Sequence, residues 1–292
     1  MSPAHRIALV GAGIGSSLSP ALHTHEAVEL GLGNYRYDLV DLDAENLDVA
    51  DTADVVRKAV RDGRTGLNVT HPCKQLVIPA LDDLSDNARL LGAVNTVVVD
   101  DGRLIGHNTD HSGFLTALQR GLPGADLDTV LLVGAGGAGS AVAYALGGAG
   151  VKDMRIADVD PDRAADVCSR VSDAFPVRAT PLAVADIPAA LPECRGVVNA
   201  TPIGMTGHPG TPFDTAALRP DLWVADIVYR PLRTELIAAA IRTGCDVLDG
   251  GQMLVAQAAD TFALLTGVTP DPGRMRGHLD ELIEDSLTKE IR

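Results

Sequence analysis

Cysteine is scarce in this sequence, and its spacing excludes one class of fold. The 292 residues include four cysteines, at positions 73, 168, 194 and 245, and no two of them form a C-x-x-C pair. This spacing does not suggest the disulfide framework of a secreted mini-protein. We therefore expect small buried thiols in a reducing, cytoplasmic environment.

Positive charge is also in short supply. The chain has 24 Lys and Arg against 39 Asp and Glu, a formal net charge of −15. Such a surface repels phosphate backbones and anionic lipids, which argues against a general nucleic-acid or membrane partner. Any anion must then be held by a local device, such as a helix N-terminus, backbone amides or hydroxyl groups.

From the sequence we expect neither a signal peptide nor a membrane span. The first fifteen residues have an apolar run only from Ile7 to Val10. Thr129–Val151 is free of charge and long enough to span a bilayer, but its glycines cluster after five residues. That pattern predicts a buried strand, a tight turn and a packed helix. Internal repeats and low-complexity linkers are also absent from the sequence.

Short apolar runs alternate with helical patterns in the first third of the chain. We predict strands at Ile7–Val10, Tyr35–Val40 and Leu67–Thr70, and a hairpin of Thr96–Val99 with Leu104–His107. We predict helices at Pro20–Leu30, Leu47–Val60, Pro72–Leu81 and Ser85–Leu91. This βαβ rhythm indicates a mostly parallel sheet covered by helices.

A second βαβ series follows a helix expected at Asp110–Leu118 and a break at Gly121–Gly124. Its expected strands are Val130–Val133, Met154–Ala157, Gly196–Asn199, Trp223–Ile227 and Val247–Leu248. Its expected helices include Pro161–Ala174 and Thr234–Thr243, and two more, Met253–Thr266 and Arg274–Ile291, end the chain. The fold class is α/β, with a substrate domain at 1–110 completed by helices at 251–292, and a doubly wound dinucleotide-binding domain at 111–250.

Two glycine-rich turns are candidates for the dinucleotide. The turn Gly11–Ser16 resembles G-x-G-x-x-G but has serine at the third glycine position. The turn Gly134–Gly139 fits throughout and lies between an expected strand and an expected helix. The three glycines of that motif allow a tight turn, close approach of amides to a pyrophosphate, and close helix–strand packing. We assign the cofactor to Gly134, Gly136, Gly137, Ala138 and Gly139.

Carboxylates follow the next expected strand and indicate which dinucleotide binds. Asp158 stands nineteen residues beyond Gly139, where an acid can accept hydrogen bonds from the adenosine ribose. Asp160 and Asp162 lie close behind it, and only Arg163 offsets their charge. Three carboxylates would repel a 2′-phosphate. The sequence therefore favours NAD over NADP, although Asp158 read alone is also compatible with an ordinary surface acid.

Polar clusters lie at several expected strand ends and helix starts. Taken singly, each is better explained by a turn or a helix cap than by a binding site. They are Ser17-Leu18-Ser19-Pro20, Asn68-Val69-Thr70 with Pro72 and Lys74, Gly92-Ala93-Val94-Asn95-Thr96, and Asn108-Thr109-Asp110.

Together these segments resemble the shikimate dehydrogenase family, including its quinate/shikimate subgroup, and the resemblance runs nearly end to end. The second half adds Gly134–Gly139, Asn199-Ala200-Thr201-Pro202 with Gly204-Met205, Asp226–Tyr229 with Pro231, and Met253–Gln257. The resemblance implies that Lys74 and Asp110 form the catalytic pair. It also implies a substrate carboxylate held by Ser17, Ser19 and Tyr229, and ring hydroxyls bound by Asn68, Thr70, Asn95 and Gln257. We further assign Arg163, Thr201 and Gly251 to the cofactor site.

The chain departs from the family pattern at two places. NADP-using members typically carry Asn-Arg-Thr where this chain has Asp158-Val159-Asp160, which again favours NAD. Cys73 stands where a bulkier residue is common. His71 beside Cys73 has no second ligand pair nearby, so we expect no metal site.

We expect an NAD-dependent shikimate dehydrogenase that interconverts shikimate and 3-dehydroshikimate. Its partner is a small cyclic hydroxy acid, and a homodimer is the assembly we consider. One alternative is quinate or an aminoshikimate as the main substrate, because NAD suits a catabolic direction. An alternative of another class is a non-catalytic shikimate or quinate sensor, which the presence of Lys74, Asp110 and the whole glycine motif disfavours.

Overall fold

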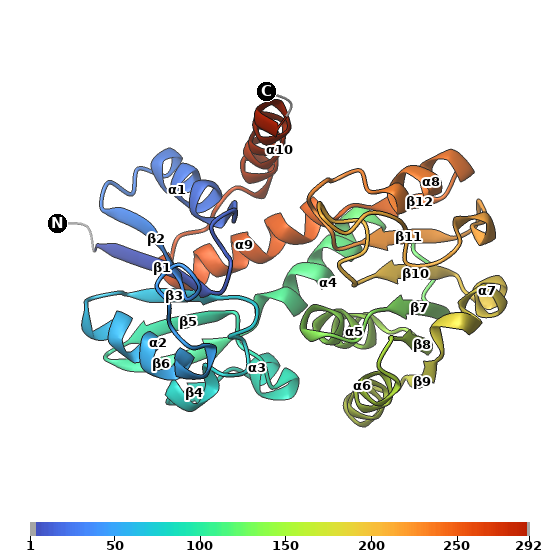
Figure 1. The fold of residues 1–292 in the computed structure, drawn as a ribbon, viewed down its shortest axis with the longest axis horizontal. Helices are drawn as coiled ribbons and strands as arrows, with labels where there is room; N and C mark the ends of the chain where they lie inside the picture. Colours follow the sequence, from blue (N-terminus) through green and yellow to red (C-terminus); the bar gives the residue numbers. More distant parts are fainter. Residues whose placement is uncertain (1–3, 291–292) are drawn as a thin grey trace. The chain divides into compact units, whose positions relative to one another are not determined.

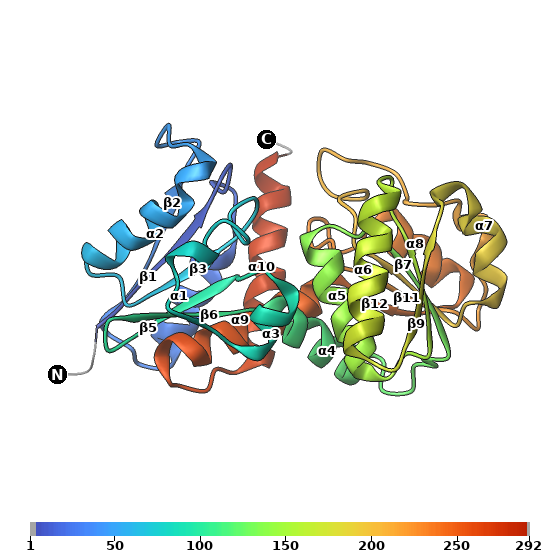
Figure 2. The ribbon, with the colours of Figure 1, turned by 90° about the horizontal axis from the view of Figure 1, so that it is seen from below.

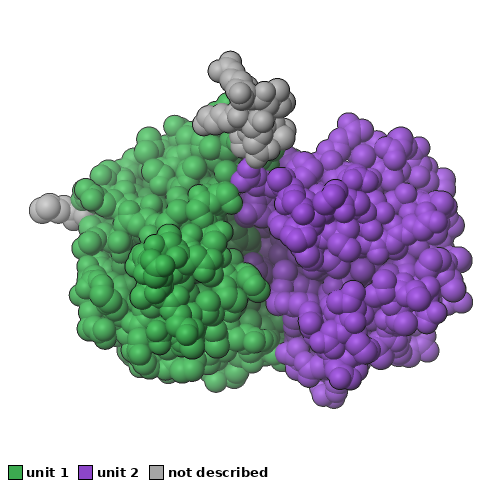
Figure 3. All heavy atoms as spheres, viewed as in Figure 1, with its two compact units in different colours: residues 1–109, 257–292 green, residues 110–256 purple. Residues whose placement is uncertain are grey.

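The structure, a computed structural model, describes residues 4–290 and divides the chain into two compact units (Figure 3). Unit 1 comprises the residues up to Thr109 and those from Gln257 onward, and unit 2 comprises Asp110–Ala256. The expected boundaries fell at 110/111 and 250/251. The last residues of the helix expected to end at Ile291 lie partly outside the described residues, since Ile291 is not among them.

Unit 1 is built on one mixed sheet of six strands in the order β2-β1-β3-β5-β6-β4 (Figure 1). Its strands are β1 (His5–Gly11), β2 (Tyr35–Asp41), β3 (Gly66–Val69), β4 (Asp83–Leu84), β5 (Thr96–Asp100) and β6 (Arg103–His107). β1 pairs in parallel with β2 and β3, whereas β5 pairs antiparallel with β3 and β6. The predicted hairpin is present, and Asp101 and Gly102 at its tip both have positive φ, which a tight two-residue turn requires.

The helices of unit 1 come from both ends of the chain. They are α1 (Ser19–Glu29), α2 (Thr52–Arg61), α3 (Asp86–Leu91), α9 (Gly250–Thr266, whose first residues belong to unit 2) and α10 (Pro272–Glu290). α3 begins after Ser85, whose hydroxyl accepts a hydrogen bond from the Ala88 amide. Packing of α10 against α1 is fixed by Arg274, whose guanidinium donates twice to the fully buried Glu26 carboxylate.

The helix predicted at Pro72–Leu81 is wrong. The segment forms successive turns that end in a 3-10 helix at Ile78–Ala80. Pro79 has no amide to donate to the helical ladder, and the Lys74 carbonyl accepts instead from the Val94 amide. The helix predicted at Leu47–Val60 likewise begins later, because Val49–Asp51 is a 3-10 turn before α2.

Unit 2 is a parallel sheet of six strands in the order β12-β11-β10-β7-β8-β9. Its strands are β7 (Thr129–Val133), β8 (Asp153–Ala157), β9 (Arg178–Leu182), β10 (Gly196–Asn199), β11 (Trp223–Asp226) and β12 (Asp246–Leu248). β9 was not predicted. It is an edge strand that pairs only with β8 and contains Pro181, which an edge position tolerates.

The helices of unit 2 cover both faces of this sheet, as a doubly wound fold requires. They are α4 (Thr109–Gly121), α5 (Gly137–Ala149), α6 (Pro161–Ala174), α7 (Ile187–Ala190) and α8 (Glu235–Thr243). α5 and α6 lie side by side on one face, and α8 lies on the other (Figures 1 and 2). Numbered along the unit, the strand order is that of a Rossmann sheet, with its reversal between β7 and β10.

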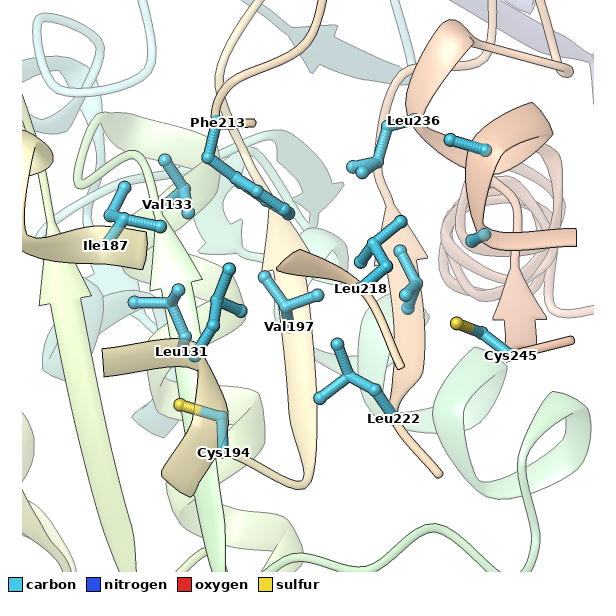
Figure 4. Close-up of a cluster of buried hydrophobic side chains, with 14 of the residues drawn as sticks. Leu131, Val133, Ile187, Cys194, Val197, Phe213, Leu218, Leu222, Leu236 and Cys245 are labelled. Atoms are coloured by element: carbon cyan, nitrogen blue, oxygen red, sulfur yellow. The ribbon is translucent and has the colours of Figure 1, made fainter. Parts of the chain in front are cut away.

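Apolar residues of the strands and of α8 fill the core of unit 2 (Figure 4). Leu131 on β7, Val197 on β10 and Leu236 on α8 are each at most 1% exposed. The charge-free stretch Thr129–Val151 forms β7 and α5, joined by the glycine-rich turn. Within residues 4–290, no helix is long and apolar enough to cross a membrane.

Candidate active site

The glycine-rich turn Gly134–Gly139 lies at the strand reversal of the unit 2 sheet, where such folds bind nucleotides. It leaves β7 at Gly134, whose φ of +101° is in the region that favours glycine. A Cβ on Gly139 would lie 2.0 Å from the Gly134 carbonyl oxygen, so only glycine allows α5 to start this close to β7. A Cβ on Gly136 or Gly137 would meet nothing within 4 Å. The turn is therefore closed by backbone on one side and open on the other.

The open side presents the amides that begin α5. The N-cap residue is Gly136, and no side chain caps the helix. The amides of Gly137, Ala138 and Gly139 belong to the first turn, where a helix offers no carbonyl partner. Such amides favour an anion, which the positive end of the helix dipole also attracts. The geometry fits the pyrophosphate of a dinucleotide.

Asp158 follows β8 and faces this turn. One carboxylate oxygen accepts the Ala135 amide at 2.7 Å, and the other accepts the Asp160 amide at 2.9 Å. Its side chain is 6% exposed, and an Arg163 nitrogen lies 3.7 Å away. Two amide bonds leave lone pairs on both oxygens, so the carboxylate keeps capacity to accept hydroxyl donors.

Asp160 and Arg163 have structural partners of their own. Asp160 caps α6 by accepting the amides of Asp162 and Arg163, and it also binds the Arg163 guanidinium at 3.2 Å. These bonds, the Arg163 amide first, hold the pKa of Asp160 below its ordinary value. Between Asp158 and Asp160, Val159 is 87% exposed. The edge beside the turn therefore carries two carboxyl groups and one apolar side chain.

The other two residues assigned to the cofactor also lie in unit 2. Thr201 follows β10, and its methyl carbon would lie 3.0 Å from a Cβ on Gly134, so it packs against the glycine-rich turn. The Gly251 amide donates to the Asp249 side chain at 2.9 Å, at the start of α9.

In unit 1, the amide side chains assigned to the substrate are members of one buried network. Asn68 lies next to the last residue of β3, opposite Thr96 of β5. Its oxygen accepts the Tyr37 hydroxyl at 2.7 Å, and its nitrogen donates to the Asn95 carbonyl and the Thr96 hydroxyl. Both N–H groups of Asn68 are thus used, and the group it still offers is a lone pair on its oxygen.

Asn95 and Gln257 belong to the same network through Thr109. The Asn95 oxygen accepts the Thr109 amide at 2.9 Å, and its nitrogen contacts the Thr109 hydroxyl at 2.9 Å. The Thr109 hydroxyl lies 3.4 Å from the Gln257 oxygen and 2.9 Å from the hydroxyl of Thr261, which is fully buried one turn further along α9. The structure brings Asn68, Asn95 and Gln257 together through hydroxyl groups.

Two of these connecting residues, Tyr37 and Thr261, were missed in the sequence, and Thr96 was given no role of its own. Tyr37 and Thr261 hold the amides in place but have no distinctive spacing. For Tyr37, the alternation of buried and exposed positions along β2 is a usable signal, because Tyr37 is the one residue of this strand that is buried.

Ser17 and Ser19 precede and begin α1. The Ser17 hydroxyl accepts the Ser19 amide at 3.3 Å, whereas the N-cap position is Leu18 and no side chain caps the helix. Helix capping alone therefore does not account for both hydroxyls. Thr70 lies further along the same sheet edge, and a Cβ on Gly11 would lie 2.6 Å from its methyl carbon.

Lys74 lies in a turn that is tied to a neighbouring segment, and Asp110 lies at the start of a helix. The Lys74 carbonyl accepts the Val94 amide at 2.8 Å, which ties its turn to the segment before β5. Asp110 lies in the first turn of α4, directly after Thr109, and is 9% exposed. Tyr229 is half-buried after β11, and burial raises the pKa of its hydroxyl.

Metal ligation finds no support at Cys73. Its thiol is fully buried, and burial raises its pKa, which disfavours the thiolate that binds metals. Among residues 4–285, whose side chains the structure describes, no three His, Cys, Asp or Glu side chains converge as a metal site.

Comparison with known proteins identifies the family. A model of the shikimate dehydrogenase substrate binding domain matches residues 9–97. The chain is 52% identical over 278 residues to the NADP(+) shikimate dehydrogenase of Pseudarthrobacter chlorophenolicus, covering 95% of this chain and 94% of that protein. The chain belongs to the shikimate dehydrogenase family.

Other members of the family are named for the other cofactor. The quinate/shikimate dehydrogenase (NAD(+)) of Corynebacterium glutamicum is 45% identical, over 92% of this chain and 96% of that protein. The solved structure of quinate dehydrogenase from Corynebacterium glutamicum in complex with NAD superposes with a TM-score of 0.88 at 43% identity, covering 94% of this chain and 98% of that chain. The resemblance and the α/β fold predicted from the sequence are confirmed, and the chain is an oxidoreductase of this family.

Proposed function

We propose that this protein is an NAD-dependent shikimate dehydrogenase that reversibly converts shikimate to 3-dehydroshikimate. The observation that carries the proposal is the similarity to dehydrogenases of this family over nearly the whole chain. The cofactor choice rests on the chain's own residues, because the relatives divide between NADP(+) and NAD(+).

The open amides of the turn Gly134–Gly139 would hold the pyrophosphate, with Thr201 and Gly251 close to the same sheet edge. Asp158 would accept the hydroxyls of the adenosine ribose. A 2′-phosphate there would lie against the carboxylates of Asp158 and Asp160, with only the half-exposed Arg163 to offset them. Repulsion between the 2′-phosphate of NADP and these carboxylates disfavours NADP, so NAD is the preferred dinucleotide.

The bound nicotinamide supplies the hydride acceptor. The chain must supply a group that takes the proton of the substrate hydroxyl, and we assign this to Lys74 with Asp110 as its partner. A positioned acid–base group of this kind contributes ~10²–10⁴ in rate.

The substrate acid would be held by the hydroxyls of Ser17, Ser19 and Tyr229. Around the ring, Asn68 would accept a hydroxyl proton on its remaining lone pair, and Thr70, Asn95 and Gln257 would complete the set. A buried polar partner left unpaired by an analogue lacking one hydroxyl gives strong discrimination. The buried hydroxyl network of unit 1 would preserve this arrangement without substrate.

Quinate is the second candidate substrate. The similarity in fold to the quinate dehydrogenase from Corynebacterium glutamicum in complex with NAD favours it, because that protein also pairs this fold with NAD. A cytoplasmic location and a homodimer remain predictions.

Steady-state kinetics with shikimate and quinate, each with NAD and NADP, test the proposal. We expect the highest kcat/KM for shikimate with NAD. A higher value with quinate would select the second candidate, and equal values with both dinucleotides would contradict the cofactor assignment.

A further inference from the structure

A buried carboxylate at the nucleotide-binding edge of unit 2 has no part in the chemistry proposed above. Asp226 ends β11 and is 2% exposed, and its register partner Asn199 ends β10 and is fully buried. The Asn199 nitrogen donates to one Asp226 oxygen at 3.0 Å. A charged side chain kept inside a protein costs free energy, so its partners explain why it is there.

Three donors from three segments converge on Asp226. Besides Asn199 of β10, the Val228 amide of the following loop donates at 3.0 Å, and the Thr234 hydroxyl at the start of α8 donates at 2.7 Å. The Thr234 oxygen in turn accepts the Ile237 amide and caps α8. An ionised carboxylate suits this arrangement because it accepts only.

Asn199 also holds the loop after β10 by hydrogen bonds. Its oxygen accepts both the amide of Thr201, at 3.0 Å, and the Thr201 hydroxyl, at 2.7 Å. Its nitrogen also donates to the Ile203 carbonyl, and the Ile203 amide donates back to the Thr201 hydroxyl. The conformation of residues 200–203 is therefore fixed from Asn199.

The two loops that leave Asn199 and Asp226 carry residues assigned to different ligands. Thr201 packs on Gly134 of the glycine-rich turn, and Tyr229 lies one residue beyond Val228, whose amide Asp226 holds. A further bond joins the loops directly, from the Thr206 amide to the Arg230 carbonyl at 2.9 Å.

We propose that Asp226, acting through Asn199, Val228 and Thr234, is a positioning residue that locks the cofactor loop at residues 200–206 to the substrate loop at residues 227–233. This inference rests on the proposed function, since that function assigns Thr201 and Tyr229 to the two ligands. Asp226 touches neither ligand in this scheme. Its effect on catalysis passes through the two loops.

The pKa of Asp226 agrees with a positioning role, because a group kept only for stability would not need to carry a charge inside the protein. Burial raises its pKa to about 6, while the bonds from Thr234, Val228 and Asn199 oppose that rise. At neutral pH the chain thus keeps a charge that its surroundings partly disfavour. Buried networks that cost stability are found where geometry serves function.

Four variants test the proposal. Asp226→Ala removes all three bonds, whereas Asp226→Asn keeps a carbonyl for Asn199 and Val228 and presents an amide to Thr234. Thr234→Ser keeps the hydroxyl. The matched control is Asp153→Asn, which removes a carboxylate that pairs with Arg178 at the opposite, amino end of the same sheet.

Three readouts separate positioning from a general structural role. They are amide hydrogen exchange along unit 2, NADH binding by fluorescence, and KM for the cyclic acid. For Asp226→Ala we expect faster exchange in residues 200–206 and 227–233 with strand exchange unchanged, and a roughly ten-fold rise in both the NADH Kd and the KM. Asp226→Asn should lie between Ala and the unmodified protein, and Thr234→Ser and Asp153→Asn should match the unmodified protein.

Exchange that rises equally in the strands and the loops would overturn the proposal, because Asp226 would then stabilise unit 2 as a whole. Unchanged loops and constants in Asp226→Ala would overturn it as well. Failure of the proposed function is a separate result: the unmodified protein would oxidise neither shikimate nor quinate, while exchange and NADH binding would still report on Asp226.

Discussion

The two glycine-rich turns of this chain follow the first strand of their units, yet only the second is open to an anion. In unit 1, the Asp41 carboxylate at the end of β2 accepts the amides of Gly13 and Ile14, each at 2.9 Å. In unit 2, Asp158 beyond the end of β8 accepts one turn amide, that of Ala135. The carboxylate stands in the same place in both units but takes up more of the first turn.

The two turns also differ in where the following helix begins. α5 begins at Gly137, inside the glycine motif, so its free amides point out of the turn. α1 begins only at Ser19, after the motif has ended. A glycine-rich turn becomes a phosphate site when a helix starts within it and the chain's own acid leaves its amides free. In unit 1, the turn is instead a rigid lead into the serines assigned to the substrate.

The largest expected effect separates chemistry in unit 1 from cofactor binding in unit 2. Lys74→Met should lower kcat by ~10²–10⁴, because proton transfer loses its acid–base group. NADH affinity, measured by fluorescence titration, should stay unchanged. Adding Asp110→Asn should cost less than the product of the single effects, as expected for one catalytic unit. Near-normal turnover in Lys74→Met would transfer the role of base to Asp110.

The second prediction compares one glycine from each turn. Gly139→Ala places a Cβ 2.0 Å from the Gly134 carbonyl oxygen, so the turn must open and NADH should bind roughly ten-fold more weakly or worse. Gly13→Ala has space but a φ of +66°, so it should cost about 1–2 kcal/mol of stability and leave NADH affinity alone. NADH titration of both variants measures the affinity, and thermal unfolding measures the stability. Similar losses of NADH affinity in the two would erase the distinction between the turns.

The third prediction compares the two acids. The double variant Asp158→Ala with Val159→Arg removes a carboxylate and adds a guanidinium beside the ribose. The ratio of kcat/KM with NAD to that with NADP should fall by about ten-fold or more, the value of a charge-assisted hydrogen bond. Asp41→Ala is the control and should leave this ratio unchanged. A ratio that does not move in the double variant would remove Asp158 from cofactor choice.

The fourth prediction concerns the serines beyond the first turn. Ser17→Ala should raise the KM for shikimate roughly ten-fold, since a hydrogen bond to a charged group is worth about 1.5–3 kcal/mol. The KM for NAD should not change. If the KM for shikimate also stays constant, the Ser17 hydroxyl only accepts the hydrogen bond of the Ser19 amide and does not bind the substrate.

The smallest effect is in stability against pH, and it has opposite signs in the two units. Burial alone would raise the pKa of Asp41, but donors led by the Gly13 and Ile14 amides hold it below 3.8. Its contribution to stability is therefore present above that pH and lost as the pH falls further. Burial raises the pKa of Asp226 to about 6, so its contribution is present below 3.8 and lost as the pH rises to about 6.

The midpoint of urea unfolding, measured across pH, reports both pH dependences of stability. Asp226→Asn should flatten the decline between pH 4 and 6, and Asp41→Asn should flatten the loss at lower pH. Equal profiles for the two variants would contradict these assignments.

The sequence predicts the fold where hydrophobic pattern and turn chemistry agree. Strand β10 (Gly196–Asn199) and helix α6 (Pro161–Ala174) have the predicted bounds. Helix α6 begins at Pro161 because Asp160 caps it and proline is tolerated in its first turn. Prediction fails where a contact with a residue distant in the sequence determines the local structure. The Lys74 carbonyl accepts the amide of Val94, which lies outside the segment, and nothing within Pro72–Leu81 predicts that partner.

The site divides in the same way. The glycine motif and Asp158 are predictable because each function needs a residue type at a fixed offset. Thr261 is not, because a lone threonine on a helix acquires its role only when α9 lies against Thr96 and Thr109. Asp41 has the offset of a nucleotide-binding acid in unit 1, and only its two amide bonds show that it serves the turn itself.

The split of unit 1 between the two ends of the chain has a consequence for how the protein is made. On the ribosome, all of unit 2 is synthesised before Gln257, so its sheet can form while unit 1 is still incomplete. Unit 1 then waits for the last segment, whose Leu265 packs on Gly66 and whose Arg274 neutralises Glu26, 248 positions earlier. Until translation ends, a carboxylate that is fully buried in the finished protein stays without its arginine. Unit 1 can therefore be completed only after the whole of unit 2 and the last segment of the chain have been synthesised.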